Sequence, residues 1–159
     1  MSKSWRDKRD NPPKGLPKIV DTATLANPAM EKRFGKGKMF IATPLLVDAQ
    51  IRKVKKGKLV TTGIIRERLA KEVGADFTCP LTTGIFINIA ARAAEEDRAA
   101  GRKGIAPYWR VVKDNGRLNE KFPGGVEGHA AKLSAEGYKL DRTTKVPRIA
   151  DFEKSLQKL

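Results

Sequence analysis

The sequence contains one cysteine, Cys79, and one histidine, His129, among 159 residues. A single cysteine excludes an internal disulfide, and with one histidine the usual zinc-ligand sets cannot be assembled. The longest apolar run, about residues 39–47, contains Thr43 and Pro44 and is far shorter than a membrane span. The charged N-terminus has no apolar stretch behind it and does not resemble a signal peptide. We therefore expect no metal, no cofactor, no membrane contact and a cytoplasmic location.

Acidic residues are scarce relative to basic ones. The chain has 33 Lys and Arg against 18 Asp and Glu, which gives a formal net charge of +15. Such an excess favours a polyanionic partner, because each phosphate that a Lys or Arg neutralises releases condensed counterions. A charge-rich solubilising surface is the alternative interpretation, but few basic residues near the start of the chain have acidic neighbours. Length and composition together indicate one soluble domain.

Three parts can be distinguished along the chain. Residues 1–38 are basic and rich in proline, which predicts an N-terminal arm that is only partly ordered. Residues 39–140 carry the periodic apolar pattern of a folded body. Residues 141–159 form a C-terminal tail, whose end is expected to be a short helix.

Within the body, the apolar pattern predicts two helices arranged as a helix-turn-helix. The first covers residues 62–73 and is ended by Gly74. The second covers residues 84–100, with Thr82 and Thr83 as its N-cap, and is the candidate recognition helix. Other elements are expected at residues 44–54 (helix), 59–61 (strand), 105–113 (strand) and 126–136 (helix).

The segment Pro107-Tyr108-Trp109-Arg110-Val111-Val112, followed by Asp114-Asn115-Gly116, is similar to the active-site strand and turn of the alkylguanine-DNA alkyltransferases. The resemblance begins in the stretch from Val54 to Ile65 and continues through Thr83-Gly84-Ile85, Gly124-Gly125, Lys132-Leu133 and Glu136-Gly137. The order and spacing of these motifs are more specific than any one of them. The resemblance implies an α+β, mostly α, fold: a winged helix-turn-helix of the alkyltransferase C-terminal domain type with a small β-wing.

Four positions depart from the pattern of this family. The family has a cysteine that accepts the alkyl group and a histidine that activates it, where this chain has Tyr108 and Trp109. Thr62 replaces the tyrosine that rotates the phosphate, and Leu81 replaces the arginine finger. An aromatic ring cannot accept an alkyl group as a thiolate does. The resemblance therefore implies a scaffold without the transfer chemistry, as in the alkyltransferase-like proteins that bind flipped alkylguanine.

By this resemblance, the chain is expected to be a non-enzymatic, monomeric protein that binds duplex DNA through the minor groove. A pocket lined by Tyr108, Trp109 and Glu136 would recognise flipped alkylated guanine for DNA repair, with nucleotide excision repair proteins as further partners. Neighbouring residues of a strand face opposite sides, so only one of the two aromatic rings would enter this pocket. Two alternatives stay open: an enzyme acting on alkylated DNA, by Cys79-dependent transfer or glycosylase-like chemistry, and an architectural or regulatory DNA-binding protein without lesion preference.

The expected DNA contacts are hydroxyl, amide, backbone and basic groups near the two helices. They comprise Thr62, Gly63, Leu81, Thr82, Thr83, Gly84, Asn88, Arg110, Lys113 and Lys121. For Arg110 the resemblance favours a structural role over a phosphate contact, because the matching arginine of the family is largely structural. In place of the arginine finger, Leu81 would act as an apolar wedge between base steps. Cys79 is interpreted as a plain buried thiol, and His129 as a solvent-facing or capping residue on a helix flank.

Overall fold

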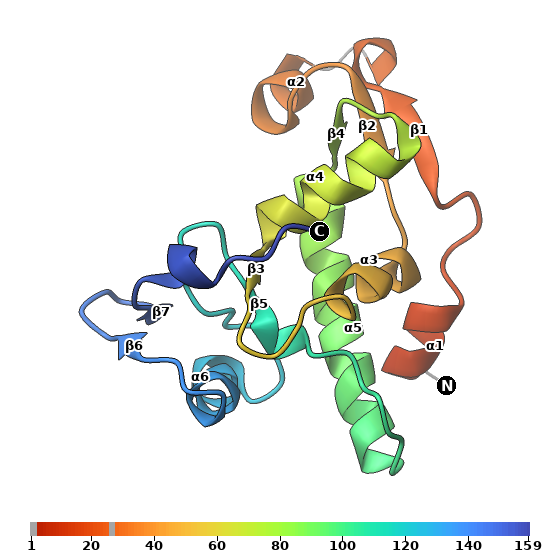
Figure 1. The fold of residues 1–159 in the computed structure, drawn as a ribbon. Helices are drawn as coiled ribbons and strands as arrows, with labels where there is room; N and C mark the ends of the chain where they lie inside the picture. Colours follow the sequence, from red (N-terminus) through yellow and green to blue (C-terminus); the bar gives the residue numbers. More distant parts are fainter. Residues whose placement is uncertain (1–2, 26–27) are drawn as a thin grey trace.

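The computed structural model describes residues 3–25 and 28–159. Within this part the fold is mixed α/β, with helices α1–α6 and three small sheets. Figure 1 shows the long helix α5 (Pro80–Ala99) running through the middle of the molecule, with the shorter helices around it. In the part of the chain described, no helix combines the length and the apolar character that crossing a membrane requires.

Helices α3 and α4 begin where the local sequence signals predict, and α4 also ends there, whereas α3 ends at Ile51, three residues before the predicted end at residue 54. α3 (Pro44–Ile51) has proline in its first turn, and the Thr43 hydroxyl accepts a hydrogen bond from the backbone N–H of Leu46 at 3.2 Å. α4 (Thr62–Val73) is capped in the same way by the hydroxyl of Thr61, and Gly74 ends it in the left-handed conformation. Both helices pack against α5 and supply one wall of the core.

Helix α5 begins at Pro80, one turn before the predicted start at Gly84. Proline suits the first turn of a helix, because its missing N–H would have no partner there. Thr82 and Thr83 therefore lie inside the helix, and the Thr83 hydroxyl donates to the carbonyl of Cys79 at 2.7 Å. The prediction that these threonines cap the helix is wrong, since Cys79 holds the N-cap position.

A three-stranded sheet joins the N-terminal segment to the connection between α4 and α5. β1 (Lys18–Asp21) pairs antiparallel with β2 (Lys38–Ile41), which pairs in parallel with β4 (Phe77–Thr78). β4 is the connection between α4 and α5. The 3-10 helix η1 (Thr22–Leu25) and helix α2 (Pro28–Phe34) lie between β1 and β2 in the chain. The predicted boundary between residues 38 and 39 thus falls inside β2.

The strand predicted at residues 105–113 is much shorter in the structure. β5 is only Val111–Val112, and it pairs in parallel with β3 (Val60–Thr61). Before it, Tyr108–Arg110 form a 3-10 turn, η2. Tyr108 and Trp109 are therefore not neighbours on a strand, and the expectation that they face opposite sides of a sheet does not apply.

The C-terminal region folds back onto the body. α6 (Gly125–Ala135) lies close to its predicted position and is followed by the antiparallel pair β6 (Leu140–Asp141) and β7 (Arg148–Ile149). The helix expected at the end of the tail is only a 3-10 turn, η3 (Phe152–Ser155). Because β6 spans the predicted boundary at residue 140, the tail continues the fold instead of extending from it.

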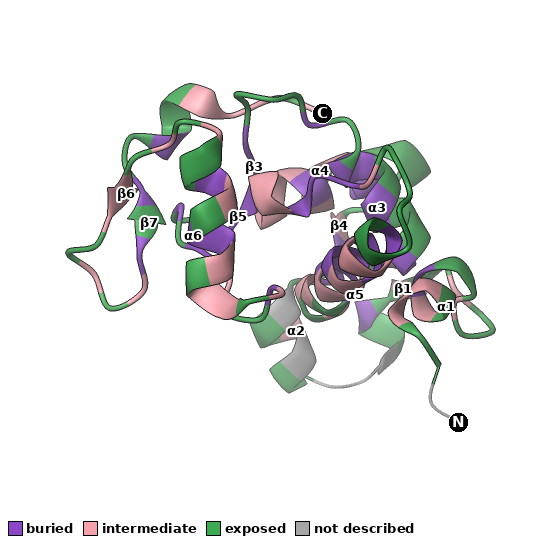
Figure 2. Ribbon diagram, turned by 90° about the horizontal axis from the view of Figure 1, so that it is seen from below, coloured by how far each residue is buried: buried purple, intermediate pink, exposed green. Residues whose placement is uncertain are grey.

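The buried side chains form two clusters. The larger lies between α3, α4 and α5 and includes the aromatic rings of Tyr108 and Phe122. The smaller lies between α6 and the C-terminal strands, around Leu118 and Leu133. Figure 2 shows the buried positions in α3, α4 and α5 where these helices face one another, and on the side of α6 that faces β5. Trp109 contacts both clusters and connects them.

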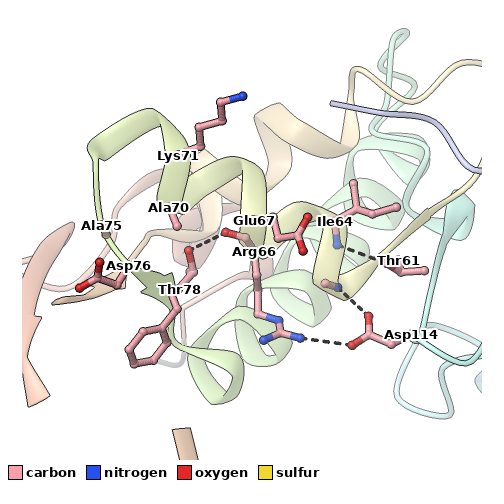
Figure 3. A pocket seen from close by; sticks show the side chains of 12 residues that line it. Thr61, Ile64, Arg66, Glu67, Ala70, Lys71, Ala75, Asp76, Thr78 and Asp114 are labelled. Carbon is pink, nitrogen blue, oxygen red and sulfur yellow. Dashed lines mark hydrogen bonds and ion pairs between the residues drawn. The ribbon is translucent and has the colours of Figure 1, made fainter. Parts of the chain in front are cut away.

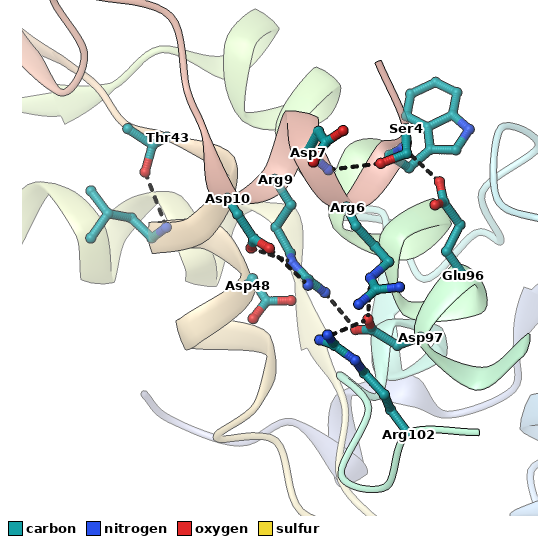
Figure 4. Close-up of polar contacts among 12 residues, drawn as sticks. Ser4, Arg6, Asp7, Arg9, Asp10, Thr43, Asp48, Glu96, Asp97 and Arg102 are labelled. Atoms are coloured by element: carbon teal, nitrogen blue, oxygen red, sulfur yellow. Dashed lines mark hydrogen bonds and ion pairs between the residues drawn. The ribbon is translucent and has the colours of Figure 1, made fainter. Parts of the chain in front are cut away.

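Helix α1 (Trp5–Asp10) is attached to α5 by a buried ion pair (Figure 4). The guanidinium of Arg9, only 5% exposed, donates to the carboxylate of Asp97 at 2.6 Å. Arg6 lies 3.1 Å from the same carboxylate, and the backbone N–H of Trp5 donates to Glu96 at 2.6 Å. The first helix of the basic N-terminal segment is thus part of the folded body.

Replacing Arg9 with alanine should lower the free energy of unfolding by about 3 kcal/mol, because a buried carboxylate then loses its best partner. Arg6 and Arg102 remain near Asp97 and keep the loss at the low end for a buried pair. The measurement is urea unfolding. The paired change Arg9→Met with Asp97→Leu should recover most of the loss, and a double variant as unstable as Arg9→Ala would contradict this account.

Candidate nucleic-acid interface

A groove of about 410 Å³ lies between the beginning of α4, the beginning of α5 and the loop that follows β5. Six of the residues expected to contact DNA line it: Thr62, Leu81, Gly84, Asn88, Lys113 and Lys121. They come from three separate stretches of sequence, so the fold is what brings them together. Arg66, Ile85, Asp114 and Asn119 also line the groove and were not predicted from the sequence.

Two large apolar side chains are exposed on the first turns of α5. Leu81 is 53% exposed and Ile85 is 49% exposed, and their spacing puts them one turn apart on the same face of the helix. Neither belongs to the buried clusters, whereas Phe86 and Ile87 beside them do. The face that α5 turns toward the groove is therefore apolar at its centre, with lysines of the neighbouring loop at its edge.

One acidic residue, Asp114, lies in this basic groove. Its carboxylate accepts hydrogen bonds from the backbone N–H of Gly63 at 2.7 Å and from the hydroxyl of Thr62 at 3.1 Å. Arg66 donates to its second oxygen at 3.2 Å (Figure 3). A carboxylate is favourable at the positive end of a helix dipole. Asp114 thus attaches the loop after β5 to the start of α4.

A chain of hydrogen bonds runs from the groove into the core. Asn119 donates its side-chain amide to Asn88 on α5 at 3.2 Å, and its backbone N–H donates to Nδ1 of His129 at 3.0 Å. Since Nδ1 accepts, Nε2 carries the proton and donates to the carbonyl of Trp109 at 2.8 Å. His129 is 0% exposed, and burial lowers its pKa to about 4. The expectation of a solvent-facing or capping histidine is wrong, because both ring nitrogens have partners inside the protein.

Four of the residues predicted to contact DNA lie outside the groove. Thr83 is buried, and the hydroxyls of both Thr82 and Thr83 donate to the carbonyl of Cys79. Gly63 lines the adjacent hollow, and its N–H is bonded to Asp114. Arg110 points away and pairs with Glu136. Thr83 is therefore a core residue and Arg110 holds the fold, so neither is free to contact DNA in this structure.

Tyr108 occupies the core and does not line an open pocket. Its side chain is 0% exposed, and its ring packs edge-on against Trp109 and Phe122 at centroid distances of 5.3 and 5.2 Å. Its hydroxyl donates to Glu95 on α5 at 2.7 Å. Burial and this bond raise the pKa of the phenol far above its usual value. The expectation that Tyr108 contacts a flipped base does not hold for this structure, since no face of the ring is accessible.

Trp109 and Glu136, the other two residues of the expected lesion pocket, lie together at a different place. Arg110 donates to the Glu136 carboxylate through Nε at 2.9 Å and Nη2 at 2.7 Å. Burial would raise the pKa of Glu136, but the hydrogen bonds from Arg110 and Trp109 outweigh it and lower the pKa. Half-buried Trp109 lines a hollow of about 480 Å³ with Arg52, Val54 and Arg110 among its walls.

Cys79 is buried, in agreement with its interpretation as a plain thiol, and its backbone N–H donates to the carbonyl of Phe40 at 2.9 Å. Within residues 3–25 and 28–159, no group of three or more His, Cys, Asp or Glu is placed to hold a metal ion.

A larger hollow of about 640 Å³ adjoins the groove along α4 (Figure 3). Arg66 and Asp114 line both the hollow and the groove. From them the hollow extends to Asp76 and Phe77 at β4. The two hollows therefore form one continuous surface from the loop after β5 to the three-stranded sheet.

Comparison with known proteins gives a likeness at the level of the fold. No protein-family model matches the chain, and no curated protein matches it in sequence. Among solved structures, S. pombe Atl1 in complex with damaged DNA containing O6-carboxymethylguanine aligns with a TM-score of 0.50 and 17% identity, over 73% of this chain and 94% of Atl1. S. pombe ATL in complex with DNA aligns with a TM-score of 0.48 at the same identity and coverage. The Atl1 likeness agrees with the alkyltransferase-like fold that the sequence motifs imply, while the winged-helix detail stays a prediction.

Protonation of His129 should destabilise the fold in a defined pH range. Its pKa is lowered from 6.5 to about 4, so between these values the unfolded chain binds a proton that the folded protein excludes. The free energy of unfolding should fall by about 3 kcal/mol from this group as the pH decreases from 6.5 to 4. The histidine NMR signal should titrate near 4, and it comes from the chain's only histidine. Titration near 6.5 would contradict the buried, neutral ring.

Proposed function

We propose that this protein binds duplex DNA without catalysing a reaction, and that the groove between α4, α5 and the loop after β5 is the contact surface. The observation that carries the proposal is the convergence of Lys113, Lys121 and Arg66 around exposed Leu81 and Ile85 at the start of the candidate recognition helix. The net charge of +15 provides the long-range attraction to phosphates. The fold-level likeness to Atl1, a protein solved with damaged DNA, supports the same assignment.

The geometry of the groove suits a mode of binding that depends on the backbone and shape of DNA. Lysines at the rim can reach phosphates, and these contacts position the duplex without reading its sequence. Leu81 and Ile85 are placed to wedge against base steps, as apolar side chains do in the minor groove. Asn88 is held by Asn119 and presents the remaining part of its amide to the groove.

The residues that would have to react with alkylated DNA are buried or bonded within the fold. The Tyr108 phenol is buried, hydrogen-bonded and protonated, so it cannot act as a nucleophile. The Cys79 thiol is buried at the beginning of α5. Glu136, the carboxylate for a glycosylase-like reaction, is bound on both oxygens by Arg110. These residues support a binding protein over an enzyme that acts on alkylated DNA.

Recognition of alkylated guanine is a second candidate function, favoured by the hollow beside Trp109. Its volume of about 480 Å³ and its indole wall would allow a flipped base to stack. Buried Tyr108 argues against a pocket at the position expected from the sequence. We therefore propose that binding is independent of lesions, as for an architectural DNA-binding protein.

Removing the two rim charges should weaken binding uniformly. In the variant Lys113→Gln with Lys121→Gln, the slope of log Kobs against log salt should decrease by about 2, because two phosphate contacts are lost. Leu81→Ala with Ile85→Ala should weaken binding about tenfold at constant slope, since the lost contacts are apolar. Fluorescence anisotropy with an undamaged duplex measures both effects.

Lys3→Gln with Lys103→Gln is the matched control, because it removes the same charge from two exposed lysines outside the groove; it should stay close to wild type. The same duplex with one O6-alkylguanine distinguishes the two candidate functions. Equal affinity for both duplexes supports lesion-independent binding, whereas tighter binding to the lesion, lost in Trp109→Ala, would replace it with lesion recognition. Unchanged affinity in both groove variants would exclude the groove as the contact surface.

Neutralising Asp114 should strengthen DNA binding. Asp114→Asn retains an oxygen for the N–H of Gly63 but removes a negative charge that faces incoming phosphates. We expect affinity to rise by about three- to tenfold at low salt, with the gain shrinking as salt screens the charge. The stability loss should stay below about 1 kcal/mol, since the lost ion pair with Arg66 is solvent-exposed. Weaker binding would mean that Asp114 orders the groove more than it repels DNA.

A further inference from the structure

A second basic surface lies where α2 leads into β2. The stretch from Lys32 to Lys38 contains Lys32, Arg33, Lys36 and Lys38, all exposed. Its acidic neighbours are Glu31, which precedes it in the chain, and Asp21 and Asp76, which lie beside Lys38. None of these residues lines the groove or the adjoining hollow. This surface is therefore separate from the residues assigned to DNA binding so far.

The fold fixes this basic surface beside the start of the recognition helix. The backbone N–H of Lys38 donates to the Asp76 carboxylate at 2.8 Å, and its carbonyl accepts from the N–H of Asp76 at 2.9 Å. Gly35 lies against the ring of Phe77, which a methyl group on Gly35 would contact at 3.5 Å. β4 leads into Pro80, the first residue of α5. The contacts of Gly35 and Lys38 with this region therefore place α2 at the end of the molecule where α5 begins, as Figure 1 shows.

The surface is also continuous with the groove. The groove shares Arg66 and Asp114 with the adjoining hollow, and that hollow ends at Asp76 and Phe77. These last two residues are the ones that contact Gly35 and Lys38. A rod-like polyanion lying in the groove along this direction would next reach Lys32 at the end of α2 and Lys36 and Lys38 after it.

We propose that Lys32 and Lys36, with the neighbouring Arg33 and Lys38, bind the phosphate backbone of the same DNA duplex beyond the groove and lengthen its binding site. This inference rests on the proposed function of the groove. Lysines bind phosphate as mobile point charges, so they suit backbone contacts that do not depend on sequence. The occupant is duplex DNA because only a long, regularly charged partner spans both surfaces.

The test compares two double variants that remove the same charge. Lys32→Gln with Lys36→Gln removes two lysines of the basic surface. Lys3→Gln with Lys103→Gln removes two exposed lysines near the other end of α5, which is about 30 Å long. Binding to a duplex of about 16 base pairs and to one of about 8 is measured by anisotropy from 50 to 200 mM salt, ranges over which phosphate contacts change affinity strongly.

The Lys32/Lys36 variant is called the α2 variant. On the longer duplex, the slope of its log Kobs against log salt should decrease by about 2, and its affinity should fall at least tenfold. The control variant should stay close to wild type. On the shorter duplex, which occupies only the groove, the α2 variant should bind nearly as well as wild type. Equal losses in both variants would reduce the effect to net charge and overturn the inference. Wild-type behaviour of the α2 variant, with binding lost in the Lys113/Lys121 variant, would overturn it and leave the proposed function intact. If wild type does not bind either duplex, the proposed function itself fails.

Discussion

The burial of Tyr108 is the constraint on which the rest of this site depends. A buried hydroxyl without a partner would destabilise the fold by about 1–3 kcal/mol, so the bond to Glu95 at 2.7 Å is needed for the ring to lie in the core at all. Glu95 belongs to α5, and Tyr108 begins the 3-10 turn η2 that leads into β5. The bond therefore holds the strand that supports one wall of the groove against the helix that supplies the other. The residue that the sequence resemblance aligns with the reactive cysteine of the alkyltransferases is thus a structural connection in this fold.

The hydrogen bonds around His129 extend this connection to both sides of the molecule. Asn88 and Asn119 lie in the groove, His129 lies in the core, and the carbonyl of Trp109 lies next to the Arg110–Glu136 pair. In a low-dielectric interior such a fully bonded chain is rigid, because any rotation would leave a buried group unpaired. The frame of the groove is thus fixed by internal bonds, while Leu81, Ile85 and the rim lysines remain exposed for a ligand. This division explains why residues in and around the Pro107–Val112 motif stabilise the fold and do not face a ligand.

The sequence predicted the features that local chemistry determines. Capping signals determine where α3 begins, at Thr43 and Pro44, and where α4 ends, at Gly74. The apolar period determines the position of α6, and the structure agrees with all three predictions. The predicted start of α5 at Gly84 is wrong because Pro80 occupies the first turn of the helix, while Thr82 and Thr83 imitate a cap signal inside it. Tyr108 was misassigned because a 3-10 turn, which no periodicity reveals, replaces most of the predicted strand. Asp114, Asn119 and the Arg110–Glu136 pair depend on contacts between distant segments, so their partners were not visible in the sequence.

The distribution of charge explains how the groove can contain one acidic residue, Asp114, and still attract phosphate. Asp97, Glu95 and Glu136 each form an ion pair with a basic side chain within the fold. Because the two charges of each pair cancel, these pairs contribute nothing to the net charge. The surplus of +15 is therefore carried largely by exposed lysines and arginines, where it attracts phosphate. Asp114 opposes that attraction, yet it accepts the N–H of Gly63 and joins the loop after β5 to α4. Without it, the positive end of α4 would lose its partner and the loop after β5 would lose its attachment to α4, so the repulsion accompanies the ordering of the groove.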